Sequence, residues 1–514
     1  MSGLFGSFNV AVKGLNANQT ALHTTGHNIS NANTPGFNRQ RVELTADTPF
    51  NVPGVGQLGT GVRIQSVVRV VDEFVDNQIR NENSILAQYE AQYDTIGQIE
   101  MVFNEPSNTG LNFAMGEMFN AWQELSKNPE SLNAKTIVVE KSKAFADTLN
   151  HMANRANQLQ EDVVGNVHKN VFDVNSLVTQ LNTVNDQIAN IQLKGHSAND
   201  LMDTRDQLLQ GLSTIGDITT SFDTMGRASV KMGGETITGK DSPMTLSSVA
   251  SIEKDTGGNV INVTIFEGGD TSKPVTISGN PVTISGNTEG LKVGQPIFYT
   301  PASGTEPNTL QVAEVKSGAL GGNLNSMEEI ENRVEDLTKF AEGVKYMFNS
   351  VHNPDNEEVY DPLTPDIDFF TGENALDFQV NALILQNEGL VRTGDNINSP
   401  DGDGSRALAI ANLRNVKIDF NSPGTDTETG NTMEGAYGDI VIKVGVKTEQ
   451  ASNMMDNQTA VLAQLYNRRE SVSGVSIDEE VTNLLKFQRS YEANSRVINT
   501  INEMLDVLIN RTGV

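Results

Sequence analysis

Cysteine is absent from the 514 residues of this chain. Its absence excludes disulfide bonds, iron–sulfur clusters, thiolate zinc sites and a cysteine nucleophile. Folding therefore cannot depend on redox state, which suits a chain that crosses between compartments. Aromatic residues are also scarce, at 6% with a single Trp, so we expect cores built mainly of aliphatic side chains.

Long apolar runs are missing as well. No segment approaches the roughly 18 consecutive apolar residues of a transmembrane helix, so we expect no membrane insertion. The first six residues, Met1 to Gly6, contain neither a basic region nor a continuous apolar run, and do not fit a cleaved secretion signal. Taken alone, these features indicate a soluble cytosolic protein.

Positive charge is deficient, with 36 Lys and Arg against 65 Asp and Glu and a net charge of −29. Nucleic acids and anionic membrane surfaces need clustered basic side chains, so we expect neither as a partner. The acidic excess lies in the middle of the chain, because residues 1–71 carry five basic and two acidic side chains and residues 477–514 carry four and six. Nearly neutral ends can pack against copies of themselves while the acidic middle stays solvated.

The N-terminal segment shows a heptad repeat that is typical of a coiled-coil helix. An apolar row is interleaved with a row of small or polar residues, and the sequence Thr34-Pro-Gly36 then ends the helix. The apolar row consists of Phe8, Leu15, Leu22 and Ile29, and the second row of Leu4, Ala11, Asn18 and Thr25. Residues up to Val67 alternate with glycines and predict a β-hairpin.

The C-terminal segment has the same period. Its two rows are Leu484, Tyr491, Ile498 and Leu505, and Phe487, Asn494, Ile501 and Leu508. Asn494 is the one amide among eight seam positions, and a single polar seam residue commonly fixes register. Ordering this segment costs more conformational entropy than burying its seam recovers, so it needs a partner. We expect the N-terminal helix to supply one surface and neighbouring copies of the chain to supply the rest.

A chain of this length predicts several domains, and we expect a multidomain α+β fold. Three- and four-residue apolar spacing predicts helix from Asp72 to about Leu212, with breaks at Gly165 and Gly195, and again at 325–352 and from Glu449 to Glu470. The expected domains are a terminal coiled-coil and hairpin domain (1–71 with 474–514), a helical rod (72–215 with 317–352 and 434–473), a β-rich outer domain (216–316), and an irregular insertion (353–433) with fifteen carboxylates and four basic residues.

The β-rich region contains a tandem heptapeptide, Pro-Val-Thr-Ile-Ser-Gly-Asn, at 274–280 and again at 281–287. Each copy alternates apolar and polar residues as a short strand does. Because the copies are joined by Gly-Asn-Pro, the sequence predicts that they pair with each other as a hairpin.

Motifs for chemistry are fragmentary. Gly54 to Gly61 satisfies GxGxxG, but no buried strand precedes it and no helix follows, which favours a hairpin turn over a nucleotide site. His23 and His27 have a spacing that zinc could use but lack a third ligand, and Asp401 to Ser405 is only a fragment of a calcium loop. GxSxG, P-loop and HExxH motifs are absent. We therefore expect no catalytic residues, cofactor or metal.

Three stretches resemble the flagellar axial family of rod, hook and hook-associated proteins. They are Asn28 to Arg39 after the first heptad helix, Gly59 to Ile64 in the hairpin, and Ser473 to Asn494 leading into the last helix. The resemblance implies a structural subunit that polymerises through its terminal helices. The expected assembly interface consists of the seam residues Phe8, Leu15, Leu22, Ile29, Leu484, Phe487, Tyr491, Asn494, Ile498, Ile501, Leu505 and Leu508.

Further segments are similar to the family's hook–filament junction subunits, namely Ala198–Leu208, Ser317–Leu324, Val351–Asn353 and Phe369–Gly372. This similarity implies a ring of copies between the hook protein and a second junction protein, hook-associated protein 3. It also implies an extracellular location in the bacterial flagellum, type III export without a cleaved signal, and an export chaperone at the C-terminal helix. The alternatives are a hook or rod subunit, or a secreted adhesin or hydrolase whose acidic middle domains act outside the cell.

Overall fold

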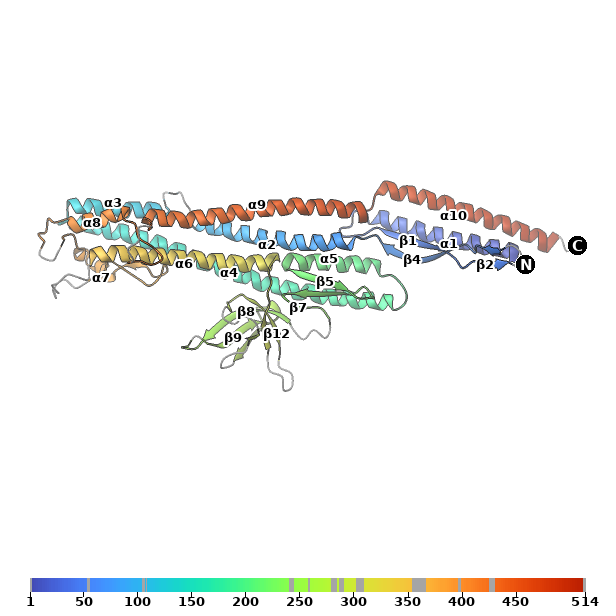
Figure 1. Cartoon of the computed structure of the whole chain (residues 1–514), viewed down its shortest axis with the longest axis horizontal. Helices are drawn as coiled ribbons and strands as arrows, with labels where there is room; N and C mark the ends of the chain where they lie inside the picture. The colour runs from blue at the N-terminus through green and yellow to red at the C-terminus, as the bar shows by residue number, and fades with distance from the viewer. Residues whose placement is uncertain are drawn as a thin grey trace.

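The computed structural model describes residues 2–52, 56–103, 107, 109–239, 245–257, 259–278, 284–285, 291–301, 309–353, 367–395, 399–424 and 430–511. The molecule is elongated, with long helices along one axis, a β domain on one flank, and both termini at the same end (Figure 1). Within the described part of the chain, no helix is both long enough and apolar enough to cross a bilayer. The predicted multidomain α+β fold, with paired terminal helices, a helical rod and an inserted β domain, is confirmed.

The rod is built from six helices: α2 (Glu73–Phe103), α3 (Leu111–Lys127), α4 (Leu132–Gln192), α5 (Asn199–Ile215), α6 (Gly318–His352) and α9 (Met433–Ser473). Pairs of these helices, such as α2 with α9 and α4 with α6, pack along their lengths around an aliphatic core. The predicted break at Gly165 is wrong, because α4 runs through it for 61 residues. Gly165 has open space where a side chain would lie, so nothing in the packing requires a break. The break at Gly195 is confirmed by its positive φ of 80° after the helix ends.

Two rod helices begin earlier than the sequence predicts, α6 at Gly318 and α9 at Met433. Glycines at 435, 438 and 445 lower the intrinsic helix propensity of the first part of α9. Tertiary contacts overcome this preference, because Tyr437 is fully buried and its hydroxyl donates to the carbonyl of Phe103 at 3.3 Å. The prediction that helix resumes only near Glu449 is therefore wrong.

The outer β domain contains a six-stranded sheet in the order β10-β9-β8-β12-β13-β11. Its strands are β8 (Thr245–Lys254), β9 (Val260–Phe266), β10 (Pro274–Ser278), β11 (Ile284–Ser285), β12 (Pro296–Thr300) and β13 (Thr309–Val312). A separate three-stranded sheet holds β5 (Ile218–Phe222), β6 (Ala228–Met232) and β7 (Glu235–Thr236).

The predicted hairpin between the two heptapeptide copies is wrong. The first copy forms β10 and pairs antiparallel with β9, whereas the second contributes β11 and pairs in parallel with β13. The copies thus occupy opposite edges of one sheet. Sequence spacing alone could not show this, because strand partners are chosen by long-range packing. Residues 279–283 and 286–287 of the repeat lie outside the described residues.

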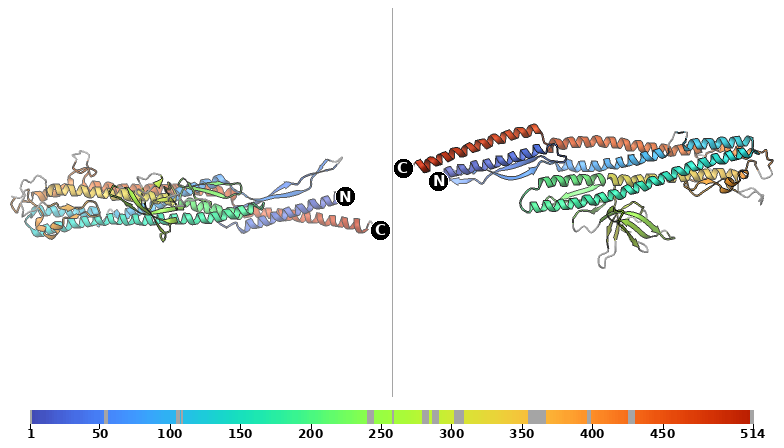
Figure 2. Two further views of the ribbon diagram at one scale, coloured as in Figure 1. Left: turned by 90° about the horizontal axis from the view of Figure 1, so that it is seen from below. Right: turned by 180° about the vertical axis from the view of Figure 1, so that it is seen from behind.

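The β domain docks on α4 through close backbone contact. A Cβ on Gly269 would approach the amide nitrogen of Phe172 in α4, and φ at Gly269 is +75°. On the same helix, His168 lies 2.7 Å from the Ser248 hydroxyl, and Asn175 donates to the carbonyl of Leu246 at 2.8 Å. These contacts fix the β domain to the middle of the rod, as Figure 2 shows from two further sides.

The described part of 353–433 is more regular than the acidic sequence indicates. It contains α7 (Ala382–Gln386), α8 (Ser405–Asn412), the short helices η3 (Glu388–Leu390) and η4 (Leu413–Asn415), and the strand pair β14 (Phe370–Thr371) and β15 (Gln379–Val380). Phe369, Phe370 and Phe378 are buried in the main core. In the fragment that resembles part of a calcium loop, Asp401 to Ser405, the Asp403 carboxylate accepts backbone hydrogen bonds from Asp395 and Ser405 at 3.0 and 2.9 Å. The carboxylate therefore stabilises a turn before α8.

His352, at the end of α6, predicts a measurable pH dependence. The side chain is fully buried; its Nδ1–H donates to the Ile367 carbonyl at 3.1 Å, and Nε2 accepts from the Arg392 amide at 3.2 Å. Burial, reinforced by nearby Arg392 and Arg406, lowers the pKa of His352 to about 3. Between about pH 3 and the ordinary histidine pKa of about 6.5, the unfolded chain binds a proton that the native state does not. The free energy of unfolding therefore decreases as the pH is lowered through this range.

We expect the rod to lose about 2 kcal/mol of stability between pH 7 and pH 5 through His352 alone. Chemical unfolding followed by helical circular dichroism at both values measures the loss. In a His352→Gln variant, which does not titrate, most of that difference should disappear. An equal pH dependence in both proteins would show that another group titrates.

Candidate assembly interface

The two ends of the chain form one unit at the narrow tip of the molecule. α1 (Ser2–Ser30) and α10 (Ile477–Asp506) lie side by side, and α10 continues into the short π-helix η5 (Val507–Arg511) (Figures 1 and 2). Between α1 and the rod the chain forms β1 (Gln40–Ala46), β2 (Phe50–Val52), β3 (Gly56–Leu58) and β4 (Val62–Arg69). β1 pairs with β4 and β2 with β3, so the GxGxxG segment lies in a hairpin, although Gly54 itself falls outside the described residues.

α10 begins where three local signals coincide. Gly474 ends α9, and the Ser476 side chain accepts from the backbone amide of Glu479 as the N-cap of α10. The first turn of α10 carries three acidic residues, which the positive end of the helix dipole favours. The helix therefore restarts at a position set by the sequence.

The most buried side chains of α1 are small. Ala11, Ala21, Thr25 and Asn28 are each at most 3% exposed, whereas the predicted apolar row Phe8, Leu15, Leu22 and Ile29 is only half-buried. On α10, Ile501 is buried, Leu508 is 63% exposed in η5, and the others are half-buried, namely Leu484, Phe487, Tyr491, Asn494, Ile498 and Leu505. The single chain thus brings the predicted residues to one seam but leaves most of their apolar surface incompletely covered.

Asn494 occupies the middle of the seam. A Cβ added to Gly14 would lie 3.0 Å from the Asn494 amide, so the glycine makes room for this side chain. The amide of Asn494 donates to Ser490 within its own helix at 3.0 Å. The close approach of Asn494 to Gly14 sets the height of α10 against α1 by shape.

The β1–β4 ribbon lies against the other side of α1. Lys13 of α1 forms a 2.6 Å ion pair with Asp47 and donates to the carbonyl of Thr60 at 3.3 Å. The hydrogen bond from Lys13 to Asp47 holds the pKa of the Asp47 carboxyl below its ordinary value. Gly61, with φ +101°, approaches the backbone of Val10, where a Cβ would lie 3.3 Å from Cα. The ribbon and the helix therefore form one terminal unit.

A buried polar cluster closes the base of the helix pair. Glu480 is 2% exposed and accepts from Asn28 at 3.0 Å and from Arg39 at 2.8 Å. The Asn28 amide also exchanges two hydrogen bonds with the backbone of Gln40, at 2.9 and 3.0 Å. Arg39 adds an ion pair with Glu479 at 3.1 Å. These side chains connect α1, β1 and α10 at one point.

A second cluster connects this terminal unit to α5 of the rod. Arg69 of β4 pairs with Asp203 at 2.7 Å and with Asp206 at 2.8 Å, and Asn38 donates to Asp203 at 2.6 Å. Burial would lower the pKa of Arg69, but the two carboxylates outweigh burial and raise it. Arg205 pairs with Asp206 at 2.7 Å and lies over the ring of Phe222, 4.2 Å from its centroid. The contact between the terminal unit and the rod is thus made largely by charged and amide groups.

Sequence reasoning missed the roles of Arg39, Glu480, Arg69 and Asp203, although it quoted the segments that hold most of them. Asn28–Arg39, Ala198–Leu208 and Ser473–Asn494 carried the family resemblance, and the structure brings all three to this junction. The sequence therefore marked most of these residues by placing them in the motifs shared with the family. The pairing was not predictable, because Arg39 and Glu480 are 441 positions apart.

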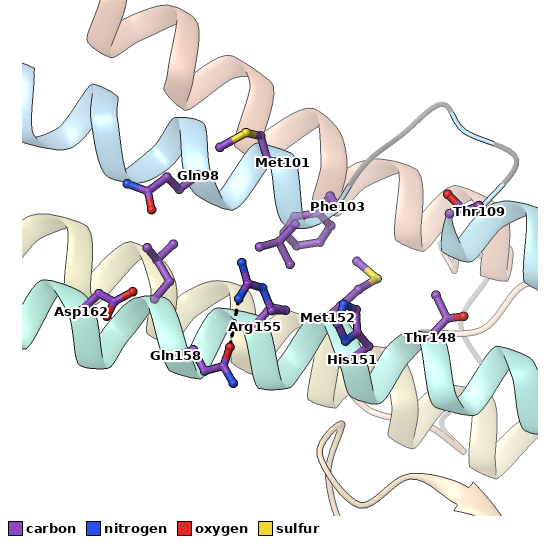
Figure 3. Close-up of a pocket in the computed structure, with 13 residues that line it drawn as sticks. Gln98, Met101, Phe103, Thr109, Thr148, His151, Met152, Arg155, Gln158 and Asp162 are labelled. Atoms are coloured by element: carbon purple, nitrogen blue, oxygen red, sulfur yellow. Dashed lines mark hydrogen bonds between the residues drawn. The ribbon is translucent and has the colours of Figure 1, made fainter.

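His27 and a surface cavity were the remaining candidates for chemistry. His27 Nε2 lies 3.3 Å from Asp200, and the ring meets Phe37 edge-on at 5.4 Å. Across the described ranges, no three His, Asp or Glu side chains are grouped to bind a metal ion. A cavity of about 490 Å3 opens between α2, the residues just before α3, and α4. Buried Phe103 and Met152 line its floor, and His151 and Arg155 lie at its rim (Figure 3). The bond drawn within it joins Arg155 to Gln158 at 3.1 Å, so the rim arginine is held by an amide.

Three family models match the chain. The model described as "Flagellar hook-associated protein FlgK helical domain" matches residues 96–260. "Flagella basal body rod protein" matches residues 8–38, and "Flagellar basal body rod FlgEFG protein C-terminal" matches residues 469–511. The two terminal matches coincide with most of α1 and with α10.

Curated relatives match over nearly their whole length. A protein named flagellar hook-associated protein 1 from Bacillus subtilis (strain 168) is 29% identical over 528 residues, covering 100% of this chain and 99% of the relative. The protein of the same name from Escherichia coli (strain K12) is 25% identical over 551 residues, covering 98% of this chain and 99% of the relative. These matches confirm the resemblance that the sequence motifs indicated.

A solved structure supports the fold. The flagellar hook junction protein FlgK from Burkholderia pseudomallei superposes with a TM-score of 0.57 at 14% identity, covering 77% of this chain and 100% of that chain. At this identity the likeness concerns the arrangement of elements alone.

Proposed function

We propose, from the premise that this chain is a homologue of proteins named flagellar hook-associated protein 1, that it is a structural subunit joining hook to filament in the bacterial flagellum. It polymerises through α1 and α10, and its function requires no catalytic chemistry. The observation that carries this proposal is the seam of the terminal helices.

The seam supports assembly because a single chain leaves it incomplete. Eleven of the twelve predicted seam side chains are less than fully buried, with only Ile501 below a tenth exposed. Further apolar side chains on the outer surface of α10 are exposed, including Val481, Leu485 and Met504. Apolar surface of this extent on paired helices is typical of an interaction face. Copies of the same chain, with matching heptads, fit that face.

The proposal extends to partners and placement. The chain forms a ring of copies with the hook protein on one side and hook-associated protein 3 on the other, outside the cell. It leaves through the flagellar export channel without a cleaved signal, and a chaperone holds the C-terminal helix beforehand. The terminal domain (1–71 with 474–514) forms the axis, and the rod (72–215, 317–352 and 434–473), the β domain (216–316) and the segment 353–433 lie outward.

Deletion of the gene tests the proposal against its alternatives. Loss of a junction subunit should leave hooks without filaments, which electron microscopy of the cells detects. Loss of a hook or rod subunit would leave no hook, and loss of a secreted adhesin or hydrolase would leave flagella intact. Either of those two outcomes would reject the junction role.

The free monomer should be disordered at its ends, because the helix pair alone buries too little apolar surface to offset the entropy of ordering. Amide hydrogen exchange on the purified monomer should find α1 and α10 unprotected and residues 75–210 protected. Verification of the monomeric state by light scattering is the necessary control. Strong protection of both terminal helices in a verified monomer would contradict this expectation.

A further inference from the structure

The tandem heptapeptide has no part in the proposed function, yet it creates an unusual situation in the β domain. Residues 274–280 and 281–287 have identical sequences. The first copy lies beside β9 at one edge of the six-stranded sheet, and the second contributes β11 at the other edge. Two chemically indistinguishable segments of one chain therefore have different partners.

We propose that the side of β9 now paired with β10 is a binding site for this heptapeptide and that the two copies exchange in it. In the exchanged state residues 281–285 replace residues 274–278 beside β9. The interaction surface is the edge of β9, and its ligand is whichever copy of the segment occupies it.

The pairing chemistry supports exchange because every contact of β10 with β9 can be reproduced. Ile277 is 7% exposed and packs with Val263 and Ile265, and Thr276 lies opposite Thr264 with their hydroxyls 3.0 Å apart. Val282, Thr283 and Ile284 stand at the same places in the second copy. A slip by an odd number of residues normally turns apolar side chains to the wrong face. Here the seven-residue repeat restores each side chain to its face.

The connections are long enough for the exchange. Upstream, the link from Phe266 to the bound strand grows from residues 267–273 to residues 267–280, and loop-closure entropy changes only slowly with length. Downstream, Ser285 must reach Gly294, whose amide donates to Val249 of β8 at 2.8 Å. That path crosses about three strand spacings, roughly 14 Å, and about 10 Å along the strands. The chain between Ser285 and Gly294 reaches roughly 30 Å when extended.

The exchange gives up little in the sheet. The contacts surrendered at the far edge are the two residue pairs that join β11 to β13, Ile284 with Leu310 and Ser285 with Gln311. The ladder gained beside β9 has the five residue pairs that β10 makes there now. The two states therefore differ mainly in loop length and in this short parallel ladder.

Cysteine pairs test the exchange directly, because the chain has no cysteine of its own. Thr264→Cys with Thr276→Cys reports the register seen in the structure, and Thr264→Cys with Thr283→Cys reports the exchanged register. Oxidised glutathione serves as the oxidant, taking up the two electrons and two protons of the paired thiols. Thr264→Cys with Thr288→Cys is the control for random encounter, since Thr288 lies outside both copies of the heptapeptide.

We expect intrachain disulfides from both reporting pairs in the dilute full-length monomer, with the 264–283 pair closing at least tenfold faster than the 264–288 control. Closure of the 264–283 pair at the control rate, or between chains only, would overturn the proposal. Peptide mapping by mass spectrometry identifies the bonds.

A substitution cycle gives a second requirement that does not depend on oxidation. Ile277→Asp alone should leave amide protection of β9 within about threefold of wild type, because the second copy replaces the first. Ile277→Asp with Ile284→Asp should lose protection at least a further tenfold. Equal losses in the single and double variants would refute exchange, and protection of α4 in all variants shows that the rod remains folded.

Discussion

Leu505→Arg is expected to abolish incorporation of the protein into the flagellum while leaving the rod and β domain folded. Leu505 lies one turn beyond buried Ile501 on the seam face of α10 and is half-buried in the single chain. In the assembly we expect neighbouring copies to cover it. An unpaired charge there should cost several kcal/mol per subunit, and in the proposed ring this cost would recur in every copy. In the free monomer we expect the segment to be disordered and solvated, so the arginine should cost almost nothing there.

Two other positions on the same segment serve as comparisons. Glu503 is exposed, so Glu503→Arg should be far milder. Leu508 is 63% exposed, so Leu508→Arg should impair assembly only if the interchain seam extends into η5. Circular dichroism should show unchanged unfolding of the central domains in all three variants.

Failed export would give the same cellular defect as failed assembly, so the experiment has to separate them. Purified variant protein is added to cells that lack the chain but carry completed hooks, and regrown filaments are counted. Restoration of filaments by external Leu505→Arg as efficient as by wild type would exclude the seam as the assembly interface.

Arg39→Met is expected to weaken the apparent affinity with which the protein is incorporated by at least about a hundredfold. Removing one member of a buried ion pair typically costs about 3–5 kcal/mol, because the remaining charge is left without its partner. Here that charge is Glu480, which is 2% exposed and would retain only the hydrogen bond from Asn28. The hydrogen bond from the Arg39 backbone amide to the Ser473 carbonyl at 2.9 Å survives the change, so the backbone before β1 should stay in place.

Arg41→Met is the matched control, since Arg41 lies two residues further along, in β1, with 67% of its side chain exposed. Glu480→Gln combined with Arg39→Met should recover a substantial part of the loss, because a neutral amide is cheaper to bury than an orphaned carboxylate. The same filament-regrowth assay measures all four proteins. Comparable losses from Arg39→Met and Arg41→Met would mean that the buried pair does not hold the junction.

Periodicity predicted the helices that carry strong heptad or three- and four-residue patterns. The helical nature of α1, α10 and most of the rod follows from their own residues, because burying one face requires that spacing. Periodicity failed at the start of α9, where glycines weaken the helical pattern and the helix is stabilised instead by burial of Tyr437 in the core. It failed again at Gly165, because a glycine with open space around it does not end a helix of favourable residues.

Partnership between distant segments was beyond the sequence. Identical neighbouring strands suggested a hairpin, but their places in the sheet depend on β9 and β13, which pack against other elements. The predicted seam lies on two helices that run side by side, but the most buried side chains of α1 are alanine, threonine and asparagine and not the predicted apolar row. The motifs that form the polar junction could be recognised, but their pairing could not be predicted, since the ion pairs Arg69–Asp203 and Arg39–Glu480 join residues 134 and 441 positions apart.

Because α4 is long and unbroken, a small change of angle at the polar junction moves the far end of the molecule by a large distance. One end of this helix lies near α5, where Asp203 and Asp206 form ion pairs with Arg69 of the terminal unit. The other end reaches the far tip of the molecule (Figure 1). A helix of 61 residues extends about 92 Å, so a rotation of one degree at the grip moves the tip by about 1.6 Å. None of the hydrophobic clusters among the described residues includes a side chain from α1 or the β1–β4 ribbon. The few hydrogen bonds and ion pairs of this junction thus set the direction in which the rod extends from the terminal unit. Small changes in their geometry are enough to shift the far end of the rod.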